Sequence, residues 1–289
     1  MSAQARLLKT LNDSSTPYVD PLARLRWESV DTDAWWLPPA ALSLAGVAAF
    51  ETLPPAARRR LSHYEFAYLL ETGLWLESLF IERFGAALNR TRDAALRARY
   101  LHEIREEAGH SLMFLELFGR SGVQIPDAAH PRSAVATRLG RLVPAPGALF
   151  WTLVVIGEEC GDRLTRMVPA GVEEVTLSAV VYHMARLHVR DEARHIAHTR
   201  AECAAATRRL PAWRRALLSP LVAAALDVLA QRLYYPRRAL YACAGLPREV
   251  DWRALARANP ARREFVAQAT ASTVEFLRSV GWRIGPSAG

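Results

Sequence analysis

Two short motifs of histidine and glutamate constrain this chain more than any other feature of its sequence. The first runs from His188 through Glu192 to His195, and the second joins Glu107 to His110. An α-helix advances about 100° per residue, so positions i, i+4 and i+7 share a face, as do positions i and i+3. Each motif therefore predicts a helix that presents its histidine and glutamate side chains on one side.

Such motifs are the ligand sets of helical bundles that bind two metal ions. A ferritin-like bundle holds a di-iron or di-manganese centre with Glu-x-x-His on two helices and one glutamate on each of two others. One Glu-x-x-His is a weak signal, but two copies on separate long helices are stronger. Salt-bridged solvent faces are the alternative. Apolar residues 112–114 and 117 follow His110 directly, so that helix buries a broad face, where ionisable groups need a partner or a metal.

Helix caps and breakers divide the middle of the chain into long helical segments. Pro55 suits the first turn of a helix, and Asp93 suits a helix N-cap. Four long helices are expected, over residues 54–88, 93–119, 148–168 and 172–207. The proline-rich residues 121–147 separate them into two pairs and are expected to form a long crossover. This order of helix pair, crossover and helix pair is the connectivity of ferritin-like bundles.

The two ends of the chain have a different character. Residues 1–53 are predicted to be an irregular N-terminal segment because prolines interrupt it, with Trp35 and Trp36 anchoring it to the body. Residues 208–289 carry apolar helical patterns and are expected to form additional C-terminal helices. We therefore expect one all-α domain over residues 1–289, a ferritin-like four-helix bundle whose metal-binding part spans residues 54–207.

Each of the remaining two long helices should contribute one carboxylate to the metals. On the third helix we favour Glu159, which shares a stripe with Val155 and Ile156, over its neighbour Glu158. That helix is apolar nearly all round, so the preference is small. On the first helix the candidate carboxylates are Glu65, Glu71, Glu77 and Glu82. We favour Glu71 because it lies on a largely apolar face, and Glu77 is its rival.

With these residues in hand, the chain resembles the p-aminobenzoate N-oxygenase family of di-iron arylamine oxygenases. The resemblance covers roughly residues 55–245, and its specific part is the His-x-x-x-Glu-x-x-His motif, because a minimal di-iron bundle has only two histidines. It implies a site of three histidines and four carboxylates. The matching metal ligands are Glu71, Glu107, His110, Glu159, His188, Glu192 and His195.

The resemblance also implies the chemistry. Two iron ions would be the cofactor and O2 the co-substrate, and an amine would be oxidised stepwise to hydroxylamine, nitroso or nitro products. No flavin or Fe–S motif is recognisable, so the electrons are expected to come from an external reductase or ferredoxin-type donor, or from the substrate itself. Two other readings stay open: a di-iron C–H hydroxylase, desaturase or oxidative-cleavage enzyme, and a ferritin-like metal-storage protein. A homodimer and a mixed manganese–iron centre also stay open.

Composition bears on partners and location. The net charge is +8, but the arginines are scattered, so no nucleic-acid partner is expected. The three cysteines, Cys160, Cys203 and Cys243, contain no Cys-x-x-Cys pair, which is typical of a reducing cytoplasm. The N-terminus lacks the apolar region of a signal peptide, and residues 148–157 are too short to span a bilayer. We therefore expect a cytoplasmic protein without a membrane partner.

Overall fold

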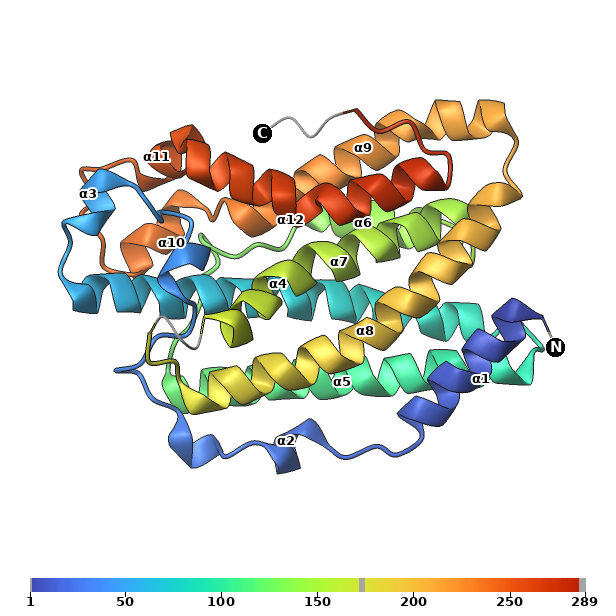
Figure 1. Ribbon diagram of the computed structural model, residues 1–289, viewed down its shortest axis with the longest axis horizontal. Coiled ribbons are helices and arrows are strands. Elements are labelled where there is room, and N and C mark those ends of the chain that lie inside the picture. The colour runs from blue at the N-terminus through green and yellow to red at the C-terminus, as the bar shows by residue number, and fades with distance from the viewer. Residues whose placement is uncertain (1, 172–174, 286–289) are drawn as a thin grey trace.

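The computed structural model describes residues 2–171 and 175–285, and its centre is a bundle of long helices. These are α4 (Pro55–Leu88), α5 (Ala94–Ser121), α7 (Ala148–Ala170) and α8 (Ala179–Arg208). Helix α4 packs along α5 and α7 packs along α8, and the two pairs face each other (Figure 1). The described residues contain no β-strand, only an isolated bridge between Trp35 and Leu177. The predicted all-α ferritin-like bundle is confirmed.

The predicted caps set the helix boundaries. Helix α4 begins at Pro55, whose missing N–H costs nothing in a first turn. The Asp93 carboxylate accepts the backbone N–H groups of Ala95 and Leu96 at the start of α5. Gly122 ends that helix in the left-handed conformation, with φ of 68°. The predicted start of the fourth helix at Val172 lies outside the described residues, and α8 begins at Ala179.

The N-terminal segment contains more helix than predicted. Residues 3–15 were expected to be irregular, but they form α1 (Ala3–Ser15), which the Ser2 hydroxyl caps by accepting the N–H of Ala5. Prolines interrupt only the part after α1, where the short helices are α2 (Pro21–Arg24), η1 (Trp27–Ser29), η2 (Pro39–Ala41) and α3 (Ala48–Glu51). Trp36 is fully buried in the main core, as its predicted anchoring role requires.

The crossover and the C-terminal helices cover the bundle from outside. The crossover contains α6 (Ala134–Leu142), which packs on α4. The C-terminal helices are α9 (Ala212–Tyr234), α10 (Arg238–Cys243), α11 (Trp252–Ala258) and α12 (Pro260–Ser279). Both α9 and α12 contact α7, and they form a layer above it in Figure 1. Because α7 is enclosed by α8, α9 and α12, its sequence is apolar nearly all round.

One stretch of the described chain, Ala212–Cys243, is long and apolar enough to cross a membrane by length and composition alone. A core helix of a soluble protein passes the same test, so this is weak evidence. Helix α9 buries Val222 and Leu226 in the main core, while Trp213 and Leu217 on the same helix are exposed. The absence of a membrane partner therefore stays a prediction.

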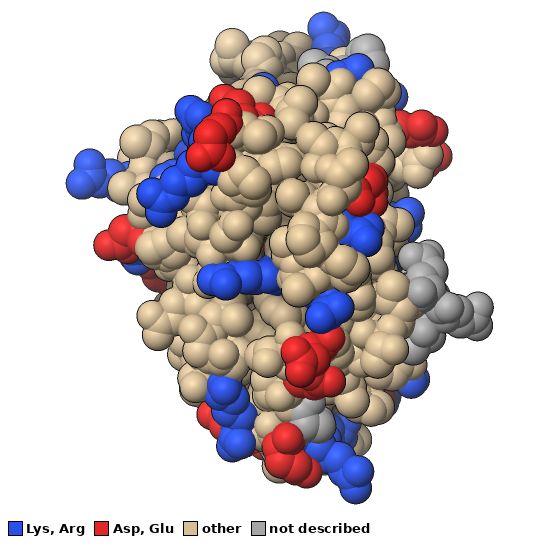
Figure 2. Space-filling model, turned by 90° about the vertical axis from the view of Figure 1, so that its left-hand side faces the viewer, with Lys and Arg blue, Asp and Glu red and all other residues tan. Residues whose placement is uncertain are grey.

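Charged side chains are interspersed on the end of the molecule that carries α3 and α10. Figure 2 shows arginines and acidic residues there as small separate groups among uncharged residues. This face therefore carries no continuous field of one sign.

Candidate metal centre

Side chains from all four bundle helices meet at the centre of the molecule. Two groups of candidate ligands lie there, and within each group the ligand atoms lie within 4.8 Å of one another. The first group consists of Glu77, His110 and His188. The second group consists of Glu107, Glu158, Glu192 and His195. We call these seven residues the central cluster. It contains three histidines and four carboxylates.

Two histidines point their Nδ1 atoms into the central cluster. His195 Nδ1 lies 3.0 Å from Glu107 Oε1 and 3.7 Å from Glu192 Oε1. His110 Nδ1 lies 3.6 Å from Glu107 Oε2 and 3.6 Å from Glu192 Oε1. The i, i+3 spacing of each Glu-x-x-His produces this convergence, since it places both side chains on the same helix face. Glu107 and Glu192 thus lie between the two histidines.

His188 occupies the other side of the central cluster. Its Nε2 lies 3.7 Å from Glu77 Oε1 and 3.6 Å from Glu192 Oε1. Its ring is 4.5 Å from the ring of His110, and Phe114 packs against it. The third histidine of the predicted motif therefore joins the other two.

Several buried polar atoms of the central cluster form no hydrogen bond and face other ligand atoms of the cluster instead. Such atoms in the described structure include Glu107 Oε1 and Oε2, His110 Nδ1, Glu158 Oε1, Glu192 Oε2 and His195 Nδ1. Buried polar groups without partners are rare in proteins and costly. Their concentration at one point, on nitrogen and carboxylate atoms aimed at each other, fits bound cations.

The buried negative charges of the central cluster also favour bound cations. The four carboxylates are at most 6% exposed, and burial of that many negative charges requires compensation. Burial, followed by the charges of Glu192 and Glu107, raises the pKa of Glu158 well above its usual value. Burial opposes protonation of His110, but the hydrogen bond to Asp191 and the neighbouring Glu107 carboxylate raise its pKa to about 10. Without cations the central cluster would hold protons instead, and two divalent ions would balance its four carboxylates.

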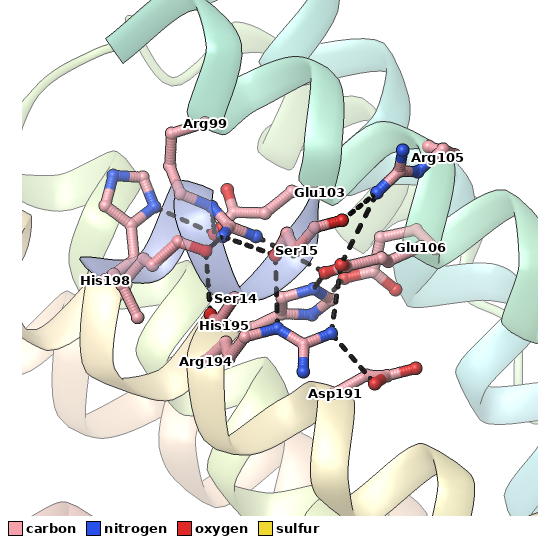
Figure 3. Close-up of polar contacts among 12 residues, drawn as sticks. Ser14, Ser15, Arg99, Glu103, Arg105, Glu106, Asp191, Arg194, His195 and His198 are labelled. Atoms are coloured by element: carbon pink, nitrogen blue, oxygen red, sulfur yellow. Dashed lines mark hydrogen bonds and ion pairs between the residues drawn. The ribbon is translucent and has the colours of Figure 1, made fainter. Parts of the chain in front are cut away.

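Two further carboxylates lie behind the histidines. Glu106 Oε2 is 2.9 Å from His195 Nε2, and Asp191 Oδ2 is 3.4 Å from His110 Nε2. The Arg194 guanidinium joins both carboxylates, at 2.9 Å and 2.8 Å (Figure 3). A carboxylate at Nε2 fixes the ring orientation and keeps Nδ1 free for a metal. Burial opposes ionisation of Glu106, but His195, Arg194 and Arg99 lower its pKa to about 2, so it stays charged.

Neither Glu106 nor Asp191 was predicted from the sequence to support a ligand histidine. A signal was present, because an acidic residue directly precedes the candidate ligand in both motifs, as Glu106-Glu107 and Asp191-Glu192. Each first residue is turned about 100° away on its helix and supports a histidine of the other helix.

The structure does not bring Glu71 into the central cluster. Its Oε2 lies 2.9 Å from His130 Nε2 in the crossover, and Glu77 takes the predicted place. The prediction took the apolar face of α4 around Trp75 as the side facing the metals. That face is covered by the crossover, where Trp75 Nε1 donates to Thr137 of α6.

Glu159 is also outside the central cluster, and its neighbour Glu158 is inside. Both Glu159 oxygens accept hydrogen bonds from Arg200, at 2.6 Å and 2.7 Å, and Oε2 also accepts one from Thr273 of α12. The apolar stripe that favoured Glu159 does not mark the metal side, because α9 and α12 bury the far side of α7 as well. The other five predicted residues come together.

A cavity lies beside the central cluster, between α4 and α7. Glu77, Glu107, Glu158, His188 and Glu192 form part of its wall. The rest of the wall is mostly apolar, with Phe80 and Leu70 from α4.

Comparisons with known proteins agree with this geometry. The family model described as P-aminobenzoate N-oxygenase AurF matches residues 2–281. The uncharacterized protein Mb0909 of Mycobacterium bovis is 27% identical over 256 residues, which cover 84% of this chain and 73% of the relative. The uncharacterized protein MT0908 of Mycobacterium tuberculosis, strain CDC 1551, is 26% identical with the same coverage.

Proposed function

Because the chain belongs to the p-aminobenzoate N-oxygenase family, we propose that it is a di-iron oxygenase that uses O2 to oxidise an amine. The observation that carries the proposal is the central cluster, where the ligand atoms of four carboxylates and three histidines converge and several of them are buried without a hydrogen bond. This is the ligand set that a ferritin-like di-iron site requires, with one histidine more than the minimal set.

Each residue of the central cluster has a role in this proposal. Glu77, Glu107, Glu158 and Glu192 would hold the metals with their carboxylates, and His110, His188 and His195 would hold them with one ring nitrogen each. When bound, two iron ions supply the electrons and open coordination positions that oxygen activation needs. Glu106 and Asp191 hold the protons on Nε2 of His195 and His110, so that each Nδ1 keeps its lone pair for a metal.

The cavity is the proposed amine site. Its largely apolar wall would keep water away from the central cluster. His188, Glu77 and Glu158 are candidate ligands that also form part of this wall. An amine that enters the cavity would direct its nitrogen toward these three residues. A cytoplasmic location and an external electron donor complete the proposal, and these two parts rest on the sequence alone.

The test combines metal analysis with product analysis. The full chain is loaded anaerobically with Fe²⁺, its iron content is measured, and O2 is then admitted under absorption spectroscopy with a panel of aromatic amines. We expect about two irons per chain and hydroxylamine or nitroso products. Iron content near zero, or one zinc per chain, would contradict the metal site. Products oxidised only at carbon would favour a hydroxylase or desaturase, and iron uptake far above two per chain would favour storage.

A further inference from the structure

The cavity beside the central cluster offers hydrogen-bond acceptors and no free hydrogen-bond donor among its described wall side chains outside the candidate ligands. Apart from the candidate ligands, its polar wall residues are Thr72, Asp162 and Thr165, and no lysine or arginine is among the wall residues. The Thr72 hydroxyl donates to the Tyr68 carbonyl, and the Thr165 hydroxyl donates to the Gly161 carbonyl. Both hydroxyl protons are therefore used within their own helices, and the wall offers acceptors to a ligand.

Asp162 is the strongest of these acceptors. It lies one turn after Glu158 on α7, on the same helix face, and is 7% exposed. Its Oδ2 accepts a hydrogen bond from Arg166, whose side chain is largely exposed and is not part of the cavity wall. Its Oδ1 is buried and has no hydrogen-bond partner in the described structure. A buried carboxylate oxygen without a partner is a site for a hydrogen-bond donor.

The geometry suits a small aromatic amine. Asp162 lies four residues after Glu158, about 6 Å along the helix axis, which is close to the distance between the two substituent atoms of a para-substituted benzene ring. An amine with its nitrogen at the central cluster would bring its far end to Asp162. A carboxylate at that end would meet the charge of Asp162 with water excluded, whereas an N–H or O–H group would satisfy Oδ1.

We infer that Asp162 selects amines that carry a hydrogen-bond donor at the end remote from the reacting nitrogen, and that it rejects amines with a carboxylate there. The inference rests on the proposed function and names its substrate class. The inference predicts that this chain binds p-aminobenzoate, the substrate in the family's name, poorly, because p-aminobenzoate carries a carboxylate para to its amine.

The test compares two ligands of nearly the same shape, p-aminobenzoate and p-aminobenzamide. Their dissociation constants are measured by calorimetry on the metal-loaded full chain without O2, so no turnover is needed. We expect the amide to bind at least about tenfold more tightly, as the loss of a hydrogen bond to a buried charge implies. In Asp162→Asn this preference should shrink to about threefold or less. The control is Glu116→Gln, which removes the exposed ion pair of Glu116 with Arg120; this pair has the same i, i+4 spacing as that of Asp162 with Arg166.

Equal or tighter binding of p-aminobenzoate would overturn the inference, as would a preference that survives in Asp162→Asn. Failure of both ligands to bind would also overturn it. The comparison on the unaltered chain needs no variant, so it decides the question even if Asp162→Asn does not fold. Iron content and oxidation of other amines are measured separately. A protein that holds two irons and oxidises p-aminobenzoate best would keep the proposed function and lose this inference.

Discussion

Glu158 and Glu159 are adjacent in α7, yet their carboxylates lie against different parts of the molecule. Glu158 joins the central cluster, and its Oε1 is buried without a partner. Glu159 accepts hydrogen bonds from Nε and Nη2 of Arg200 and from the hydroxyl of Thr273. Neighbouring residues on a helix point about 100° apart, so only one of the two joins the central cluster.

This relationship predicts opposite outcomes for two matched variants. Glu158→Ala should lose at least one iron per chain while leaving the C-terminal helices in place. Glu159→Ala should keep the iron and lower the free energy of unfolding by about 1–3 kcal/mol, because Arg200 and Thr273 lose their partner. Iron analysis and thermal unfolding of both proteins check this. Iron loss in Glu159→Ala alone would return the assignment to the residue favoured by the sequence.

The same logic separates Glu77 from Glu71 on α4. Glu77 is 4% exposed and belongs to the central cluster, while Glu71 pairs with His130 of the crossover. We expect Glu77→Ala to reduce bound iron and Glu71→Ala to leave it unchanged. Metal analysis after identical reconstitution is the measurement. Equal iron contents in the two variants would remove Glu77 from the ligand set.

The parts of the site that the sequence predicted are those fixed within one helix. The spacing of His188, Glu192 and His195 places them on one face wherever the helix lies, and the same holds for Glu107 and His110. The helix ends were predictable for a similar reason, because Asp93 and Pro55 act on the residues next to them.

The differences between prediction and structure concern which side of a helix faces the central cluster. An apolar pattern reports burial, and it does not say what buries the residue. The crossover covers the Glu71 side of α4, and α12 covers the Glu159 side of α7. Long-range packing of this kind is absent from local periodicity. Helix α1 was not predicted because the prolines from Pro17 onward were taken to interrupt the whole segment, although residues 3–15 contain none and Ser2 caps them.

The carboxylates behind the histidines should control metal affinity. Glu106 holds His195 and Asp191 holds His110, so Glu106→Gln or Asp191→Asn removes the charge behind a ligand ring. We expect each variant to bind metal about 10- to 100-fold more weakly. Competition with a chelator of known affinity provides the measurement.

The matched control for those variants is Glu103→Gln. Glu103 is also a buried carboxylate of α5 bonded to a histidine of α8, but its partner His198 is outside the central cluster. Metal affinity should stay within about threefold of the unaltered chain. If Glu103→Gln weakens metal binding as much as Glu106→Gln does, general disruption of the buried network explains both.

Gly157 shapes the cavity because it lies against Phe80. A Cβ at this position would lie 2.7 Å from Phe80 Cζ, so the ring must move. Both residues line the cavity, and we expect Gly157→Ala to weaken amine binding about tenfold or more while iron content stays unchanged. Gly85→Ala on α4 is the control, because its Cβ would meet nothing within 4 Å. Unchanged amine binding in Gly157→Ala would mean that the amine does not occupy this part of the cavity.

His63 should make folding stability depend on pH. Its ring lies 4.7 Å from the Trp36 ring, and its Nε2 is 2.8 Å from the Ala34 carbonyl oxygen. Burial lowers the pKa of His63 below its ordinary 6.5, although the hydrogen bond to Ala34 opposes this. As the pH falls below about 6.5, the unfolded chain takes up the proton first, so the free energy of unfolding decreases until the folded pKa is passed.

The measurement is the difference in unfolding free energy between the unaltered chain and His63→Gln at several pH values from 5 to 8. The glutamine amide can still donate to Ala34, and it does not titrate in this range. We expect the unaltered chain to lose stability relative to the variant below about pH 6.5, by at most about 1.4 kcal/mol per pH unit. Taking the difference cancels the titration of the central cluster, which both proteins share. A difference that stays constant from pH 8 to pH 5 would show that His63 takes up its proton equally well in the folded and unfolded chain.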